Sequence, residues 1–158
     1  GLSAGIYLPG TDRDEMVDVA IAIDVSGSIS NDMLRDFLSE IKGIMDEYTE
    51  FRVALWCFDT SVHNPVVITT SNEHLFDEYE IQGGGGTEFM CNWEYMKENG
   101  IEPKKFVMFT DGYPFGSWGD EHYCDTLFIV HGGGYGRAPV APWGTSVEYD
   151  KSELQEAA

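Results

Sequence analysis

One short stretch, residues 17–28, most constrains what this chain can fold into. It opens with the mostly apolar, largely β-branched run Val-Asp-Val-Ala-Ile-Ala-Ile and then changes to Asp-Val-Ser-Gly-Ser. A run of this length that stops at glycine and serine predicts a β-strand covered on both faces. We therefore expect this strand near the centre of a sheet, with the Asp/Ser loop just beyond its carboxyl end.

A helix is expected directly after this loop. Across residues 30–48 the apolar side chains recur at three- and four-residue steps, and Ser30 or Asn31 is placed to cap the first turn. In an open α/β sheet, ligands bind in the crevice beyond the carboxyl ends of the strands. This strand, loop and helix therefore mark a candidate ligand site.

The rest of the chain alternates between predicted strands and helices. Further strands are expected at 51–59, 65–70, 104–111, 124–130 and 145–149, and short helices at 72–79 and 88–98. The strand at 65–70 follows its predecessor too closely for a crossover helix, so it should pair antiparallel at an edge, where its leading proline is tolerated. The pattern predicts an α/β fold with a doubly wound, mostly parallel sheet, one antiparallel edge strand and helices on both faces.

A single domain is expected, because 158 residues of which 42% are hydrophobic suffice for one core. We expect residues 17–150 to form this domain, residues 1–16 to be an extended lead-in and residues 151–158 to be a polar tail. The first residue is Gly and not Met, so the chain can be a fragment of a longer protein.

The charge of the chain argues against two classes of partner. Nine Lys and Arg against 28 Asp and Glu give a formal net charge of -19, which should repel nucleic acid and anionic membranes.

There is no apolar run long enough to span a membrane and no signal-peptide pattern. The chain has three cysteines, Cys57, Cys91 and Cys124. An odd number of cysteines that are far apart in the sequence argues against a disulfide framework or a zinc cage. A cytoplasmic location is therefore expected.

Oxygen-bearing side chains gather at three predicted strand or loop ends. Asp24, Ser26 and Ser28 alternate along the first loop. Thr87 follows a run of four glycines, and Asp111 ends the strand predicted at 104–111. Carboxylates and hydroxyls without nitrogen or sulfur select Mg²⁺ or Mn²⁺ over zinc or copper. These residues are therefore candidate metal ligands.

At these residues the sequence resembles the von Willebrand factor A domains, whose metal-ion-dependent adhesion site (MIDAS) uses Asp-x-Ser-x-Ser, a Thr and an Asp from three loops. Their order and spacing agree with this chain from about residue 17 to at least residue 130. The phrases Asp-Val-Ser-Gly-Ser-Ile-Ser, Phe-Asp at 58–59, the four glycines and Thr-Asp-Gly at 110–112 look most like the A-like domain at the carboxyl end of a family of predicted metallopeptidases.

The resemblance implies a protein-binding module and not an enzyme. A Mg²⁺ or Mn²⁺ ion held by the five oxygen ligands would keep a position for an Asp or Glu carboxylate of a partner protein. The peptidase activity does not carry over, because the chain has no His-Glu-x-x-His and its histidines stand singly at positions 63, 74, 122 and 131.

Two alternatives remain open. Phosphatases of the haloacid dehalogenase type also place an Asp after the first strand and bind Mg²⁺, although Ser26 stands where they have a second acid. The chain can also be the non-catalytic half of a split metallopeptidase.

Four aromatic residues are predicted in loops at the same sheet edge as the metal: Tyr113, Phe115, Trp118 and Tyr135. They are candidates for a partner-binding surface, and the other interpretation is that they roof the core. The glycine run at 83–86 lacks the Gly-Lys-Ser/Thr ending of a Walker loop, so nucleotide binding of that kind is not expected.

Overall fold

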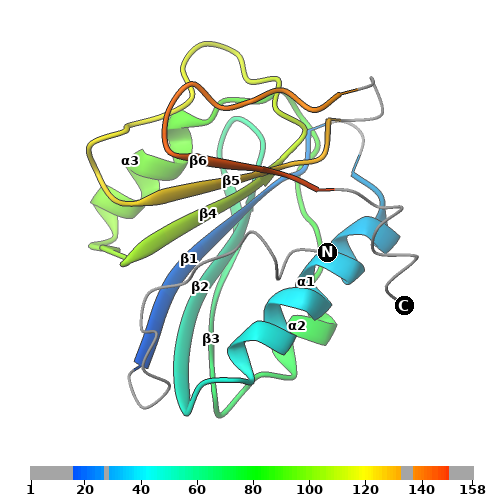
Figure 1. Ribbon diagram of the computed structural model, residues 1–158, viewed down its shortest axis with the longest axis vertical. Helices are drawn as coiled ribbons and strands as arrows, with labels where there is room; N and C mark the ends of the chain where they lie inside the picture. Colours follow the sequence, from blue (N-terminus) through cyan, green and yellow to red (C-terminus); the bar gives the residue numbers. More distant parts are fainter. Residues whose placement is uncertain (1–15, 27–28, 133–136, 150–158) are drawn as a thin grey trace.

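The computed structural model describes residues 16–26, 29–132 and 137–149, and it contains a sheet in the order β3-β2-β1-β4-β5-β6 (Figure 1). The strands are β1 (Met16–Asp24), β2 (Glu50–Phe58), β3 (Val62–Thr69), β4 (Lys105–Thr110), β5 (Thr126–Val130) and β6 (Thr145–Glu148). Every neighbouring pair is parallel except β2 and β3. The predicted fold, with the first strand near the middle, is confirmed. Residues 1–15 of the expected lead-in and the expected tail lie outside the described residues.

Helices cover both faces of the sheet. Figure 1 shows α1 (Asn31–Met45) and the short α2 (Leu75–Glu78) on one side, and α3 (Met90–Glu98) on the other. Ser30 caps α1 as predicted, because its side chain accepts a hydrogen bond of 3.1 Å from the backbone N–H of Met33. The start of α1 therefore fixes the direction in which the chain leaves the loop after β1.

The alternation of β1 divides the interior into two cores. Its large apolar side chains pack on the face that α1 covers: Val17, Val19, Ile21 and Ile23. Its alanines, at positions 20 and 22, lie on the other face and leave room for Trp56, Phe89 and Trp93. Because both faces are buried, the strand has to be largely apolar, and each large apolar side chain contributes roughly 1.5–3 kcal/mol.

The edge strand β3 differs from its prediction in where it begins. It starts at residue 62 and not at residue 65, so the predicted connection at 60–64 is wrong. The register against β2 shifts between Leu55 and Cys57, which leaves Asn64 and Pro65 opposite Trp56 alone. This is a β-bulge, with Asn64 at a φ of 49°. A bulge on an edge strand tolerates a proline inside the strand, and this is why the proline does not mark its start.

The helix predicted at 72–79 is also wrong in extent, since α2 has a single turn. Asn72 explains the difference, because its side-chain oxygen accepts a 2.6 Å hydrogen bond from the N–H of Thr69 and holds residues 69–72 in a turn.

The helix predicted at 88–98 begins two residues later than predicted, at Met90. Before it, the N–H of Glu88 bonds the carbonyl of Asp59 at 3.0 Å, which keeps this segment against the end of β2.

Candidate metal-binding site

Asp24 ends β1 at the carboxyl edge of the sheet and is 1% exposed. Its Oδ1 accepts the N–H of Ser26 at 3.0 Å and also the Ser26 hydroxyl. Its Oδ2 accepts the hydroxyl of Thr110, the last residue of β4, at 2.7 Å. The carboxylate is therefore held between its own loop and the neighbouring strand, with both oxygens oriented by hydroxyl groups.

Thr87 joins this cluster from a distant part of the sequence. Its hydroxyl is hydrogen-bonded to that of Ser26, which is also buried. The carbonyl of Thr87 accepts the N–H of Phe115 at 2.9 Å, so the glycine loop is tied to the loop that follows β4. Three separate loops thus meet at one point, as parallel strand ends are expected to do.

Asp111 is the first residue after β4 and accepts the N–H of Tyr113 at 3.2 Å. Burial raises the pKa of Asp24 to about 6, against the hydrogen bonds from Ser26 and Thr110, and the negative charge of Asp111 raises it further. Burial also raises the pKa of Asp111 above its ordinary range. The two acids therefore lie close enough to repel each other in a poorly solvated place.

In the part of the chain that the structure describes, no ion pair includes Asp24 or Asp111. Among the described residues, the ion pairs are elsewhere: Lys42–Asp77, His63–Asp59, Lys97–Asp120, Lys105–Asp125 and His122–Glu121. The donors at this edge are carboxylates and hydroxyls, which are the ligands that Mg²⁺ and Mn²⁺ prefer. In that part of the chain no three His, Cys, Asp or Glu side chains form a metal-binding group. The predicted set has only two acids, and hydroxyls make up the rest.

The structure thus brings together four of the five predicted ligands, Asp24, Ser26, Thr87 and Asp111, and Ser28 lies outside the described residues. The sequence reasoning missed Thr110, which orients Asp24. The available signal was its position, because it is a hydroxyl residue that ends an otherwise largely apolar, fully buried strand.

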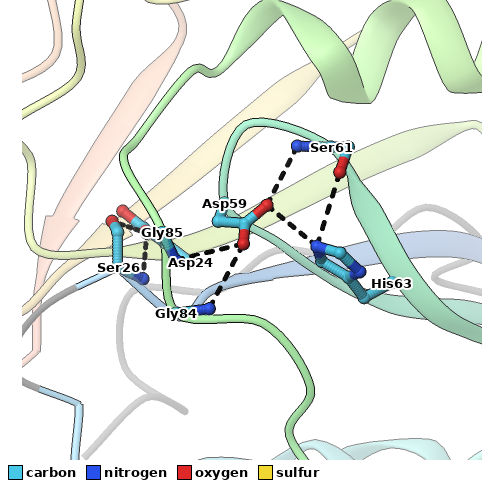
Figure 2. Close-up of polar contacts among 7 residues, drawn as sticks. All are labelled: Asp24, Ser26, Asp59, Ser61, His63, Gly84 and Gly85. Carbon is cyan, nitrogen blue, oxygen red and sulfur yellow. Dashed lines mark hydrogen bonds and ion pairs between the residues drawn. The ribbon is translucent and has the colours of Figure 1, made fainter.

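A third aspartate, Asp59, lies beside this cluster, immediately after β2 (Figure 2). Its Oδ1 accepts the N–H of Ser61 at 3.0 Å and the ring N–H of His63 at 2.9 Å. Its Oδ2 accepts the N–H groups of Gly84 at 3.2 Å and Gly85 at 3.1 Å. Burial acts to raise the pKa of Asp59, but these four donors outweigh it and hold the pKa well below its usual range. Asp59 is therefore a fully satisfied carboxylate.

The predicted aromatic surface is divided between exposed and packed residues. Tyr113 is 47% and Phe115 79% exposed, in the loop after Asp111. Trp118 is half-buried, and its ring lies edge-on at 5.3 Å from the rings of both Phe89 and Phe128. For Trp118 the packing supports the interpretation that it roofs the core, whereas Tyr113 and Phe115 stay predicted contacts. Tyr135 lies outside the described residues.

Comparison with known families gives a direct match over most of the chain. The model of the VWA-like domain (DUF2201) matches residues 19–150. The chain belongs to this VWA-like family. The resemblance seen in the sequence is thereby confirmed at the level of the domain, and the adhesion-type metal site and the metallopeptidase relationship stay predictions. Among the described residues of this VWA-like domain, no helix is both long and apolar enough to cross a membrane.

Individual relatives extend this picture. An uncharacterised protein of Thermotoga maritima is 30% identical over 109 residues, which are 68% of this chain and 26% of that protein. The chain thus spans about a quarter of the length of this relative. An aerotolerance-related membrane protein from Bacteroides fragilis, solved with multiple mutations to serine, is similar with a TM-score of 0.56 and 15% identity over 89% of this chain and 96% of that one. BatB from Bacteroides thetaiotaomicron has a TM-score of 0.53 and 14% identity over 89% and 95%. At such identities the two structures show the fold alone.

Proposed function

We propose that this domain binds a partner protein through a divalent metal ion, Mg²⁺ or Mn²⁺, held by Asp24, Ser26, Thr87 and Asp111 together with Ser28. VWA-like domains commonly mediate protein–protein interaction, which supports a binding module in general. One observation carries the metal proposal: burial raises the pKa of both buried Asp24 and half-buried Asp111, the charge of Asp111 raises that of Asp24 further, and none of the ion pairs in the described part of the chain includes either acid. A divalent cation would supply the missing charge.

When bound, the ion would offer an open coordination position to an Asp or Glu carboxylate of the partner. The protein's own residues prepare that position. Thr110 and Ser26 orient the two oxygens of Asp24, and the hydroxyls of Ser26 and Thr87 already lie together. These hydrogen bonds, among the proposed ligands and from Thr110, hold the ligands in place before the metal arrives, which lowers the ordering cost of binding.

We further propose that the domain binds and does not catalyse on its own. In the phosphatase alternative Asp24 would act as a nucleophile and a second acid would stand at Ser26. Instead, Ser26 donates to Asp24, and both carboxylate oxygens accept hydroxyl donors. The similar region makes up about a quarter of the relative from Thermotoga maritima, which is consistent with a binding module that works beside other domains. A role as the non-catalytic half of a split metallopeptidase stays an alternative proposal.

The chemistry around the site suggests what the partner presents. The exposed rings of Tyr113 and Phe115 border the metal ligands, so the partner carboxylate should be flanked by apolar surface. At a net charge of -19 the rest of the domain repels an acidic body, so that surface should be neutral or basic. The three cysteines are free thiols, which supports a reducing compartment such as the cytoplasm.

Isothermal titration with Mg²⁺ and Mn²⁺ tests the site, using the unmodified domain and the variants Asp24→Ala and Asp111→Ala. We expect each variant to lose at least about 100-fold in affinity, because each removes a charged ligand. Asp120→Asn is the matched control. Asp120 also accepts a backbone N–H two residues further on, but its ion pair with Lys97 is at the end of α3 and not at the metal site.

The same proteins, immobilised, then test partner recognition in lysate of the source cells, with Mg²⁺ or with a chelator. The proposal expects a partner that the unmodified domain retains only with Mg²⁺, that Asp24→Ala does not retain, and that requires one particular Asp or Glu of its own. Equal metal affinity in the Asp24 and Asp111 variants would refute the site. Full retention of the partner in chelator would refute the metal-bridged contact.

A further inference from the structure

Asp59 contacts the chain on both sides of Thr87. Its carboxylate accepts the N–H groups of Gly84 and Gly85, which precede Thr87, and its backbone carbonyl accepts the N–H of Glu88, which follows it, at 3.0 Å. One residue thus makes three hydrogen bonds that bracket Thr87. The segment carrying Thr87 has no helix or strand of its own and is held on both sides of Thr87 by the end of β2, in addition to the bond from Phe115 to the Thr87 carbonyl.

The other side of the Asp59 carboxylate is anchored by the β2–β3 turn and the start of β3. Ser61 and His63 donate to its Oδ1, as Figure 2 shows, so the carboxylate itself has a fixed orientation. The residue before Asp59 is tied to the first metal loop, because the carbonyl of Phe58 accepts the N–H of Val25 at 3.0 Å. The β2 end therefore connects the loop of Asp24 with the loop of Thr87.

Two glycines of the run at 83–86, Gly83 and Gly85, fit this contact closely, whereas a Cβ at Gly84 would meet no other atom within 4 Å. A Cβ at Gly83, where φ is 109°, would lie 3.0 Å from both His63 and Val25 and 3.1 Å from the Asp59 Oδ2. A Cβ at Gly85 would lie 3.3 Å from the same oxygen. Absence of side chains thus allows the backbone to approach the carboxylate. It also leaves the loop with high conformational freedom, so a fixed position for Thr87 needs an external contact.

We propose that Asp59 is the positioning residue of this site, which through Gly84 and Gly85 sets where the Thr87 hydroxyl stands relative to Asp24 and Ser26. The inference rests on the proposed metal site for its consequence in affinity. Its structural half, the placement of Thr87, does not depend on a bound metal.

Two further explanations for an effect of Asp59 on metal binding have to be separated from positioning. Its negative charge lies beside the site and attracts a cation at long range, and its loss can also unfold the loop or the domain. A charge effect depends only on net charge and weakens with salt. A positioning effect depends on whether an acceptor of the right length faces Gly84 and Gly85.

Three variants separate these cases: Asp59→Ala, Asp59→Asn and Asp59→Glu. Asparagine is neutral but keeps one oxygen at the right distance, and glutamate keeps the charge but is one methylene longer. Positioning predicts an order of Mn²⁺ affinity, by isothermal titration, of unmodified, then Asn, then Ala. For Ala we expect a loss of about 10–100-fold, the usual effect of removing a group that orients a metal ligand. Glutamate should not restore affinity. Asp120→Asn is again the control, and circular dichroism checks that each variant is folded.

Nuclear magnetic resonance of the metal-free proteins gives the second readout. In Asp59→Ala the amide signals of Gly84 and Gly85 and the methyl signal of Thr87 should shift, and in Asp59→Asn they should shift less. Unchanged Thr87 signals in folded Asp59→Ala would overturn the inference, whether or not the unmodified domain binds Mn²⁺. Equal affinities of the Asn and Ala variants with full affinity of the Glu variant would also overturn it, in favour of charge. Failure of the unmodified domain to bind Mn²⁺, with shifted Thr87 signals, would refute the proposed function but support the positioning role.

Discussion

Asp24 and Asp59 occupy equivalent places in the fold, each at the end of a buried parallel strand at the same sheet edge, yet their carboxylates are in opposite situations. Asp59 has four N–H donors, two of them from a distant loop, and the pKa of its carboxyl group is lowered. Asp24 has fewer donors, two of them hydroxyls, lies near a second acid, and has a raised pKa.

This difference distinguishes two kinds of buried carboxylate. A carboxylate whose lone pairs all meet N–H groups stabilises the chain around it and has little left to offer a ligand. The charge of a carboxylate that shares a poorly solvated place with another acid is neutralised either by a proton, which is why its pKa is raised, or by a bound cation. Asp59 thus stabilises the chain at this edge, whereas Asp24 is the carboxylate that we propose as a metal ligand.

The largest expected effect in a metal-free protein is that of Asp59→Ala, which should lower the free energy of unfolding by about 2 kcal/mol. The reason is that hydrogen bonds to a charged group contribute roughly 1.5–3 kcal/mol, and the exposed glycine amides regain water when the carboxylate is lost. Urea unfolding at pH 7 in the presence of a chelator measures it. A change below about 0.5 kcal/mol would mean that Asp59 does not stabilise the chain at this edge.

The next effect is the pH dependence of metal affinity, which distinguishes binding at Asp24 from binding at Asp59. Because Asp24 binds metal only when ionised and burial raises the pKa of Asp24 to about 6, Mg²⁺ affinity should be constant above that pH. It should fall by up to about tenfold for each pH unit below it. If Asp59 were the ligand, its lowered pKa would keep affinity constant down to pH 5. Calorimetric titrations at pH 7, 6 and 5 measure this, and a constant affinity would contradict the assignment.

The smallest effect is expected for the stability of metal-free Asp24→Asn. Because burial raises the pKa of Asp24, the stability that this residue contributes is present below the unfolded-state pKa and is lost as pH rises through about 6. Asparagine removes the buried charge but offers one acceptor fewer. We therefore expect Asp24→Asn to change the free energy of unfolding by no more than about 1 kcal/mol. Relative to the unmodified protein, the variant should be more stable at pH 7 than at pH 5.

The variant and the unmodified protein have to be compared at each pH, because a histidine also makes the free energy of unfolding depend on pH in this range. Burial lowers the pKa of His131 to about 4, so its contribution falls on acidification, with a sign opposite to that of Asp24. His131 is present in both proteins and its contribution cancels in the difference. A loss of about 2 kcal/mol or more in Asp24→Asn at pH 7 would place Asp24 in the same class as Asp59.

The central part of this architecture could be predicted because it depends on local patterns. The apolar run at 17–23 predicts a strand buried on both faces, and parallel strands necessarily bring Asp24 and Asp111 to one edge. Ser30 as a helix cap is likewise a local signal that the structure confirms. The proposed ligand set followed from residue chemistry at these ends, without knowledge of any contact, and it stays a prediction.

The support of the site could not be predicted in this way, because it depends on contacts between distant residues. Asp59 and Gly85 lie 26 positions apart, and no periodicity of the sequence relates them. Thr110 also cannot be recognised as a partner of Asp24 from the sequence, because their contact depends on how β4 lies in register with β1. The start of β3 was missed for a related reason, since the bulge at Asn64 and Pro65 is defined only by its pairing with β2.

That bulge has a consequence for aggregation. An edge strand presents a row of backbone N–H and C=O groups to which another extended chain can add, and long, regular edges are where sheets of different molecules join. In β3 the row is broken in its middle by the register shift, and Pro65 removes one donor outright. The irregularity that sequence patterns cannot show therefore makes this edge a poor template for sheet growth, and the protein can hold an apolar sheet without recruiting copies of itself there.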